Sequence, residues 1–212
     1  MVLETSLRKV GKVLILGVSL WLLASCSGSG MQIVYLQFRP TGEYATPQAL
    51  TVGVAPFQDT RSTPQILGKR VRVDGSPETI MLGSPTTGKD LSLMVVRYLE
   101  ARGMRVVDLR SWSGEPETLK DLPQDVKVAV TGRIEALEVH ADSTLFRTTT
   151  RYRVRLSSSI GLVDKNEVLT RSIELSPQKT TFQFDLRDLE EELNRAVLEA
   201  LERLFEGVLP RG

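Results

Sequence analysis

Cys26 is the only cysteine of the 212-residue chain, and its surroundings predict a covalent modification of its thiol. Residues 23–26 (Leu-Ala-Ser-Cys) have the form of a lipobox, the sequence at which bacteria acylate the cysteine and cleave just before it. A basic start and an apolar run over 13–24 precede it, and such a run is too short for a bilayer core that needs about 20 residues. The sequence therefore predicts a removable signal peptide over 1–25 and a lipid anchor at Cys26. The alternative is an ordinary secretory peptide that happens to carry a cysteine.

The predicted acylation uses the single thiol, so none remains for a disulfide, a thiolate metal ligand or nucleophilic catalysis. Cleavage before Cys26 changes the formal net charge from +1 to about −1. A chain with so little net charge is not expected to bind nucleic acid through a broad basic field. Residues 27–30 (Ser-Gly-Ser-Gly) are typical of a flexible tether.

Residues 83–90 (Gly-Ser-Pro-Thr-Thr-Gly-Lys-Asp) follow the spacing of a phosphate-binding P-loop and precede a predicted helix. Asp90, however, stands where a Ser or Thr hydroxyl would bind magnesium, and its carboxylate would repel phosphate. Pro85 also removes one backbone donor from the loop. We interpret the segment as the entry to a helix and expect no nucleotide site.

The remaining candidates for catalysis lack partners in the sequence. His140 is the only histidine, and together with Asp142 it supplies too few ligands for a metal site. Serines at 157–159 lie within a predicted strand, and no neighbouring base is indicated for them. The sequence therefore predicts a protein that is not an enzyme, with no cofactor and no metal.

Four arginines form the most distinctive pattern outside the predicted core. They alternate with apolar residues along a predicted strand at 148–163, or immediately precede it, and so share one face of it. If exposed, this basic strip could bind an acidic protein, lipid headgroups or lipopolysaccharide phosphates. The alternative is pairing with acids on a neighbouring strand, such as Glu174. The strip consists of Arg147, Arg151, Arg153 and Arg155.

Hydrophobic patterning predicts the strands that must position these residues. A hairpin turning at 74–77 accounts for much of the long insertion over 58–87. A phase change beside Gly132 indicates a bulge. A four-residue turn at 164–167 sets the register of the next hairpin so that Leu162 faces Leu169. Strands are predicted at 33–38, 50–57, 105–109, 126–139, 148–163 and 168–175.

Two helices are predicted from apolar residues at helical spacing. The first is capped by Thr87 and stops at Gly103. The second is capped by Asp185, carries one continuous apolar stripe from Leu186 to Val208, and ends near Gly207. Its stripe is expected to pack on the sheet, because its polar face is rich in glutamate rather than in the lysine typical of helices that bind anionic lipid.

The run over 52–61 (Val-Gly-Val-Ala-Pro-Phe-Gln-Asp-Thr-Arg) resembles the opening strand of YajG-type lipoproteins and of related envelope lipoproteins. The helix ending at Gly103, the valine strand that follows it, and the pattern at 128–134 are also similar, so the resemblance covers about 50–206. TolB N-terminal, CsgG and LptE type domains have similar openings. The insertion over 58–87 departs from the pattern. The resemblance implies an outer-membrane lipoprotein with no catalytic residues to carry over.

The sequence thus predicts a signal peptide over 1–25, a lipidated cysteine and flexible tether over 26–49, and one α+β domain over 50–212. Its sheet is expected to be mixed or mainly antiparallel, with about five or six strands packed against two helices. Since Ser27 replaces the Asp that, by resemblance to enterobacterial lipoproteins, favours inner-membrane retention, we expect the periplasmic face of the outer membrane.

Two function classes follow from these expectations. The first is a non-enzymatic binding, scaffold or assembly factor that is anchored to the membrane at Cys26 and docks an envelope protein. The second is an accessory in lipid or glycolipid transport, with an apolar groove between helix and sheet.

Overall fold

The computed structural model describes residues 30–37 and 50–209, and its folded unit begins at Met31. The predicted signal peptide and Cys26 lie outside the described residues. The strands are β1 (Met31–Val34), β2 (Thr51–Val54), β3 (Gln58–Asp59), β4 (Ile66–Val71), β5 (Pro77–Leu82), β6 (Arg105–Asp108), β7 (Val128–Ser143), β8 (Thr148–Leu162), β9 (Glu167–Leu175) and β10 (Gln178–Thr181). The helices are α2 (Thr87–Ala101) and α3 (Leu186–Phe205), with short 3₁₀ turns η1 (Pro116–Asp121) and η2 (Val163–Lys165).

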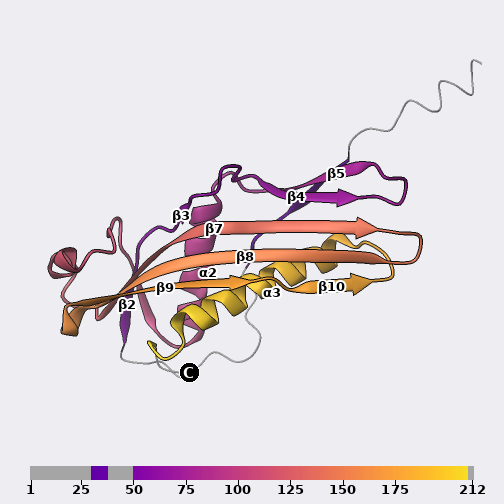
Figure 1. Ribbon diagram of the computed structural model, residues 1–212. Helices are drawn as coiled ribbons and strands as arrows, with labels where there is room; N and C mark the ends of the chain where they lie inside the picture. Colours follow the sequence, from indigo (N-terminus) through magenta and orange to yellow (C-terminus); the bar gives the residue numbers. More distant parts are fainter. Residues whose placement is uncertain (1–29, 38–49, 210–212) are drawn as a thin grey trace, which may run out of the picture. The chain divides into compact units, whose positions relative to one another are not determined.

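These strands form one mixed sheet that curls into a half-barrel (Figure 1). Its order is β1-β5-β4-β7-β2-β6, and β7 also pairs with β8, which pairs with both β9 and β10. The sheet has ten strands, so the prediction of five or six was wrong. The count fell short because the two strands of the β4–β5 hairpin were not included in it, and because β3 and β10 have two and four residues, too few to show an alternating pattern.

The hairpin predicted within 58–87 is confirmed as β4 and β5, which pair antiparallel around a turn in which Asp74 accepts hydrogen bonds from Ser76. β1 adds to β5 in parallel at the edge of the sheet. The sheet therefore starts at Met31, within the range 26–49 that the sequence assigned to the tether.

The long strands differ from the prediction in two details. The bulge in β7 lies between Ile134 and Ala136 rather than beside Gly132. In the β8–β9 hairpin, Leu169 pairs with Ile160 instead of Leu162, because the turn is 163–166 with Asn166 in the left-handed conformation. This shift is two residues, so every side chain stays on its predicted face.

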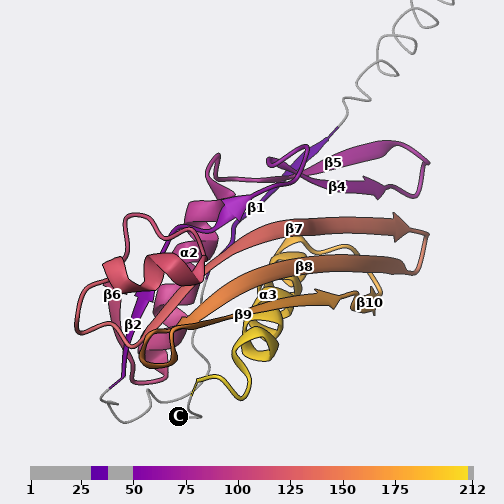
Figure 2. The same cartoon turned by 60° about the vertical axis from the view of Figure 1, so that its left-hand side comes forward.

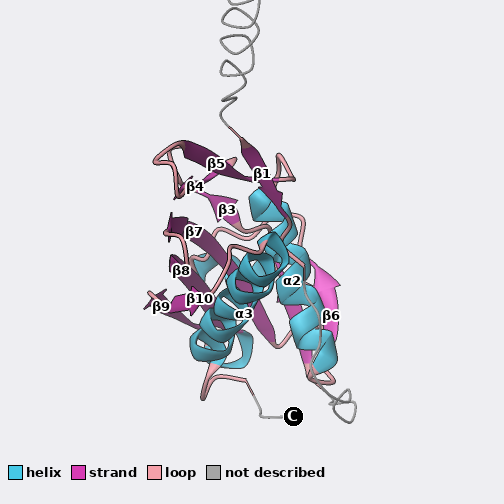
Figure 3. Cartoon of the chain, turned by 90° about the vertical axis from the view of Figure 1, so that its right-hand side faces the viewer, coloured by secondary structure: helices cyan, strands magenta, loops and turns pink. Residues whose placement is uncertain are grey.

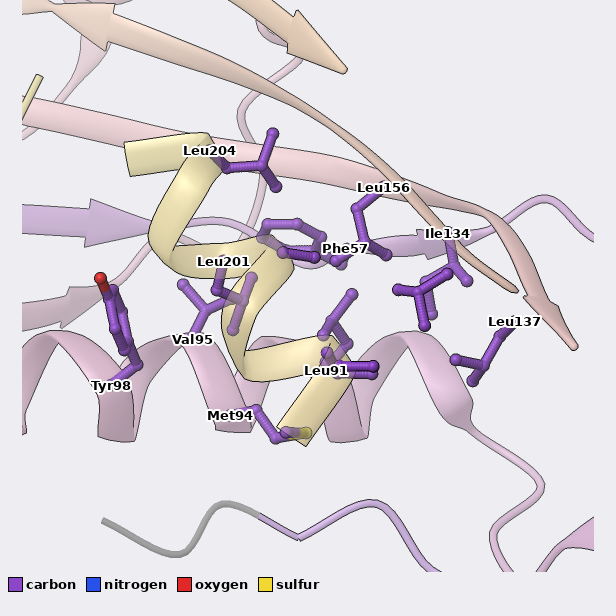
Figure 4. Packing of buried hydrophobic residues seen from close by; sticks show 14 of the residues in the cluster. Phe57, Leu91, Met94, Val95, Tyr98, Ile134, Leu137, Leu156, Leu201 and Leu204 are labelled. Carbon is purple, nitrogen blue, oxygen red and sulfur yellow. The ribbon is translucent and has the colours of Figure 1, made fainter. Parts of the chain in front are cut away.

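Both predicted helices are confirmed, and they lie side by side against one face of the sheet (Figure 3). In α3 the carboxylate of Asp185 accepts a hydrogen bond from the backbone of Arg187, which caps the helix as predicted. In α2 the cap position is Thr86 rather than Thr87. Leu91 and Tyr98 of α2 and Leu201 of α3 meet the inner face of β7 and β8 in one apolar core (Figure 4).

The opposite, outer face of the sheet is covered at one end by the segment between β6 and β7 (Figure 2). A second, smaller apolar cluster holds this segment in place. Trp112 packs against Gly161 of β8, where an added Cβ would lie 2.8 Å from Cζ2 of the indole. The buried members of this cluster are Ala55, Leu109, Trp112, Leu119, Val126 and Ala129.

Candidate functional site

A cleft of about 960 Å³ lies on the outer face of the sheet, beside the segment over 110–122. Its floor is formed by outward-facing residues of β7, β8 and β9, and its wall by the segment that carries η1. No pattern in the sequence predicted this cleft.

Small hydroxyl side chains explain why the floor is hollow. Strand pairing aligns Thr131, Ser159 and Thr170 in one row across the three strands. The neighbouring row contains Ser157 and Ser172 beside Arg133. Because Ser and Thr are short, these rows lie lower than the loop on one side and the arginines on the other, and hydroxyl groups line the depression.

The wall approaches this floor closely at one point. Gly114 has a φ of 84°, and a Cβ there would lie 2.9 Å from Oγ of Ser159. Glycine is therefore required both by the left-handed backbone and by the contact with the floor.

Two polar atoms of the residues lining the cleft have no hydrogen-bond partner among the described residues. They are Nε1 of Trp112 and Oγ of Ser157, and both are shielded from solvent. The two residues are only 7% and 8% exposed. A buried unpaired donor or acceptor costs about 1–3 kcal/mol, so such atoms are uncommon and call for a partner.

Cationic groups dominate the rim of the cleft. The side chains of Arg110 and Arg133 are exposed and form no hydrogen bond or ion pair with the rest of the described chain. Arg155 is held by Glu135 at 2.8 Å. With Asp121 as the other acid in the lining, two guanidinium groups remain available to an anion.

The predicted basic strip continues from this rim along β8. Arg151 pairs with Asp142, Arg153 with Glu174 at 2.7 Å, and Arg155 with Glu135. The hydrogen bond to Glu174 raises the pKa of Arg153 above its ordinary value. Three of the four predicted strip residues are therefore paired across strands.

Arg147, the fourth residue of the strip, lies in the turn between β7 and β8. Its carbonyl oxygen accepts a hydrogen bond from the backbone of Thr144, and its side chain is exposed. The structure thus separates Arg147 from the other three arginines.

Of the other candidates from the sequence, the serines at 157–159 line the cleft, whereas His140 and the P-loop-like segment lie apart from it. His140 lies 3.2 Å from Asp142 on β7, and no group of three or more metal-ligating side chains occurs in the described part of the chain. Ser158 faces inward and donates to the carbonyl of Thr131. At the P-loop-like segment, Gly88 packs against the carbonyl oxygen of Phe57, which a Cβ would approach to 2.3 Å.

No helix in the described part of the chain is long and apolar enough to cross a membrane. No protein-family model matches the chain, and no curated protein matches it.

Solved bacterial structures are similar at low sequence identity. Protein XCC0632 of the DUF330 family from Xanthomonas campestris is 13% identical over 82% of this chain and 92% of its own, with a TM-score of 0.49. Lipoprotein GNA1162 from Neisseria meningitidis is 10% identical over 73% of this chain and 99% of its own, with a TM-score of 0.39. A neuraminyllactose-binding hemagglutinin homolog from Helicobacter pylori is 12% identical over 82% and 95%, with a TM-score of 0.44. The resemblance to YajG-type proteins in particular stays a prediction.

Proposed function

We propose that this chain is a lipid-anchored, non-enzymatic binding protein of the bacterial envelope, placed on the periplasmic face of the outer membrane. Its cleft binds a molecule that carries an oxyanion and several hydroxyl groups, such as a phosphorylated or carboxylated saccharide. The observation that carries the proposal is the pair of buried, unpartnered atoms, Nε1 of Trp112 and Oγ of Ser157, in residues that line one cleft.

The chemistry of the cleft favours such a ligand. An indole N–H can only donate, a serine hydroxyl can donate or accept, and the guanidinium groups of Arg110 and Arg133 donate with a positive charge. An oxyanion accepts charge-assisted hydrogen bonds from arginine, and the hydroxyl groups of a saccharide can pair with the Ser and Thr floor.

The same residues support binding rather than catalysis. Ser157 and Ser159 have hydroxyl groups at the floor, but His140 belongs to a row of β7 beyond the bulge, paired with Arg151. Glu135, the acid nearest to these serines along β7, is engaged by Arg155. A nucleophilic serine needs a base within hydrogen-bond reach.

The alternative function, transport of lipid in an apolar groove between helix and sheet, has no supporting observation in the described chain. Leu193, Leu201 and Phe205 of α3 are fully buried in that layer, and their side chains fill the space that a lipid would need.

The test uses the fluorescence of Trp112 in a chain of residues 27–212. Trp112 is then the only tryptophan, because the other one, Trp21, belongs to the predicted signal peptide. Titration with glucose 6-phosphate, glucuronic acid and inorganic phosphate is expected to change its emission saturably for at least one of them. Arg133→Gln should weaken that affinity roughly tenfold or more, since a charge-assisted hydrogen bond contributes about 1.5–3 kcal/mol.

Arg151→Gln is the matched control, because Arg151 lies on the same face of β8 but does not line the cleft. The proposal fails if none of the three probes changes the emission saturably. It also fails if Arg133→Gln and Arg151→Gln alter the affinity equally, because that result would indicate binding by general charge.

A further inference from the structure

Four large apolar side chains are exposed together at the end of the sheet remote from the cleft. They lie in the turn between β4 and β5, in the turn between β7 and β8, and just after β10, three segments that end on the same side in Figure 1. Leu145, Phe146 and Phe182 are 75%, 72% and 67% exposed. We call this group the apolar tip: Val73, Leu145, Phe146 and Phe182.

Strand pairing places the three segments that carry the apolar tip next to one another. Val71 pairs with Asp142, which brings the β4–β5 turn beside the β7–β8 turn. Thr181 pairs with Thr148, which brings Phe182 beside the same turn, and the rings of Phe146 and Phe182 have centroids 6.4 Å apart. Single exposed apolar residues are ordinary, but a cluster on adjoining turns marks an interaction surface.

The position of Met31, where the folded unit starts, indicates what the apolar tip can contact. The pairings from β1 through β5 and β4 to β7 put Met31 level with His140, five residues before Leu145. Along a strand this separation is roughly 17 Å. β1 runs away from the tip, since it is parallel to β5, and β5 leaves the β4–β5 turn. The chain therefore enters β1 from the side of the tip.

The length of the preceding segment completes this geometry. Cys26 is five residues before Met31, and five extended residues span at most about 18 Å. A lipid on Cys26 therefore keeps the membrane surface no more than about 18 Å from Met31. The apolar tip extends about as far from Met31 in the same direction, so it can reach that surface.

We propose that the apolar tip inserts into the interfacial layer of the bilayer that holds the lipid anchor. Phenylalanine and leucine are suited to the boundary between headgroups and acyl chains. Arg147 follows Phe146, and its exposed guanidinium group can pair with lipid phosphates, whereas Arg72, which precedes Val73, lies 3.5 Å from its ion-pair partner Glu78. Asp74 of the same turn stays ionised, because the hydrogen bonds that it accepts from Ser76 lower its pKa, and these bonds partly replace its hydration at the membrane surface. The domain is thereby held at two points, the acyl chains and the tip, which orients it on the membrane.

The test exploits the single cysteine. In the acylated protein the thiol of Cys26 is blocked, so Leu145→Cys supplies the only free thiol for an environment-sensitive fluorophore. After reconstitution into phosphatidylethanolamine–phosphatidylglycerol vesicles, the label at position 145 is expected to shift to the blue and to be quenched by nitroxide lipids. Leu93→Cys is the matched control, because Leu93 is 49% exposed on α2, away from the tip.

A second measurement uses the non-acylated chain of residues 27–212. Replacing Leu145, Phe146 and Phe182 by serine should lower its partitioning onto the same vesicles at least tenfold, and should leave the fold intact because these side chains are already exposed. Equal quenching at positions 145 and 93, or no quenching at 145, overturns the proposal. Unchanged partitioning of the triple variant overturns it as well. Protection of the label at 145 by a bound protein instead of lipid would assign the tip to a protein partner and reject the membrane.

Discussion

Arg61 forms a two-point ion pair with Asp59, with Nε donating to Oδ1 at 2.9 Å and Nη2 to Oδ2 at 2.7 Å. Both side chains are nearly buried, at 7% and 10% exposure. Nη1 of Arg61 also donates to the carbonyl oxygen of Leu137 at 3.0 Å. This pair fastens the loop after β3 to the long strand β7, and it explains the role of the acidic and basic residues at the end of the 52–61 run.

Removing one partner should expose how much this ion pair contributes to stability. We expect Arg61→Ala to lower the free energy of unfolding by about 3–5 kcal/mol, because the charge of Asp59 is then buried without a partner. Urea denaturation followed by circular dichroism measures the change. Arg195→Ala is the matched control, since Arg195 is 67% exposed and Glu192 keeps its ion pair with Lys179, so this change should cost less than about 1 kcal/mol. Similar losses for both variants would contradict the prediction.

Arg171 offers a second prediction, because it faces the core side of β9 and donates from Nη1 to the carbonyl oxygens of Leu204 and Glu206 at 3.1 and 2.6 Å. These carbonyls belong to the end of α3, where no helical partner is available. Arg171→Met should lower stability by about 1–3 kcal/mol and accelerate amide exchange in the last turn of α3. Arg203→Met, which removes an exposed pair with Glu199 from the same turn, should have little effect. Equal exchange rates in the two variants would refute the assignment.

Tyr152 makes stability depend on alkaline pH. Burial raises its pKa well above the ordinary value of 10.0, and the charge of Glu192 raises it further. The protonated phenol is therefore favoured in the folded state, so its contribution is complete below pH 10 and is lost as pH rises further toward the folded pKa. Tyr152→Phe should make the loss of stability above pH 10 shallower, as measured by urea denaturation at a series of pH values. Tyr35→Phe is the control, because Tyr35 is 48% exposed. The same pH profile in wild type and Tyr152→Phe would show that another group governs alkaline unfolding.

The predicted lipid anchor can be tested at Cys26 itself. Cys26→Ala should abolish incorporation of labelled palmitate and leave the precursor uncleaved before residue 26, because the acyl acceptor is lost. Ser25→Thr serves as a control that changes the preceding residue but keeps the thiol. Acyl labelling that persists in Cys26→Ala would place the modification elsewhere.

Periodic elements of sufficient length were predictable from the sequence. The apolar spacing of Leu91, Val95 and Leu99 located α2, and the Asp185 cap with its stripe located α3, because each helix buries one face over several turns. The β4–β5 hairpin was also predictable from the turn that contains Asp74 and Gly75.

The strand count and the cleft depended on information that a local pattern does not contain. β3 has two residues, and it pairs only because β7 passes beside it. The hydroxyl groups at 157, 159, 170 and 172 alternate visibly, yet the β8–β9 register that aligns them depends on Asn166 adopting a left-handed conformation. The part of Trp112 in the cleft follows from tertiary packing on Gly161, which no spacing in the sequence reveals.

The edge position of β1 has a mechanical consequence. Its register with β5 runs over Met31–Val34, and the backbone of Tyr35 then donates to Glu190 of α3. A pull on the preceding chain along the axis of β1 loads these bonds together, in shear, instead of opening them one at a time as in peeling. The strand through which the chain enters the domain therefore resists tension on the preceding chain more strongly than its four residues suggest.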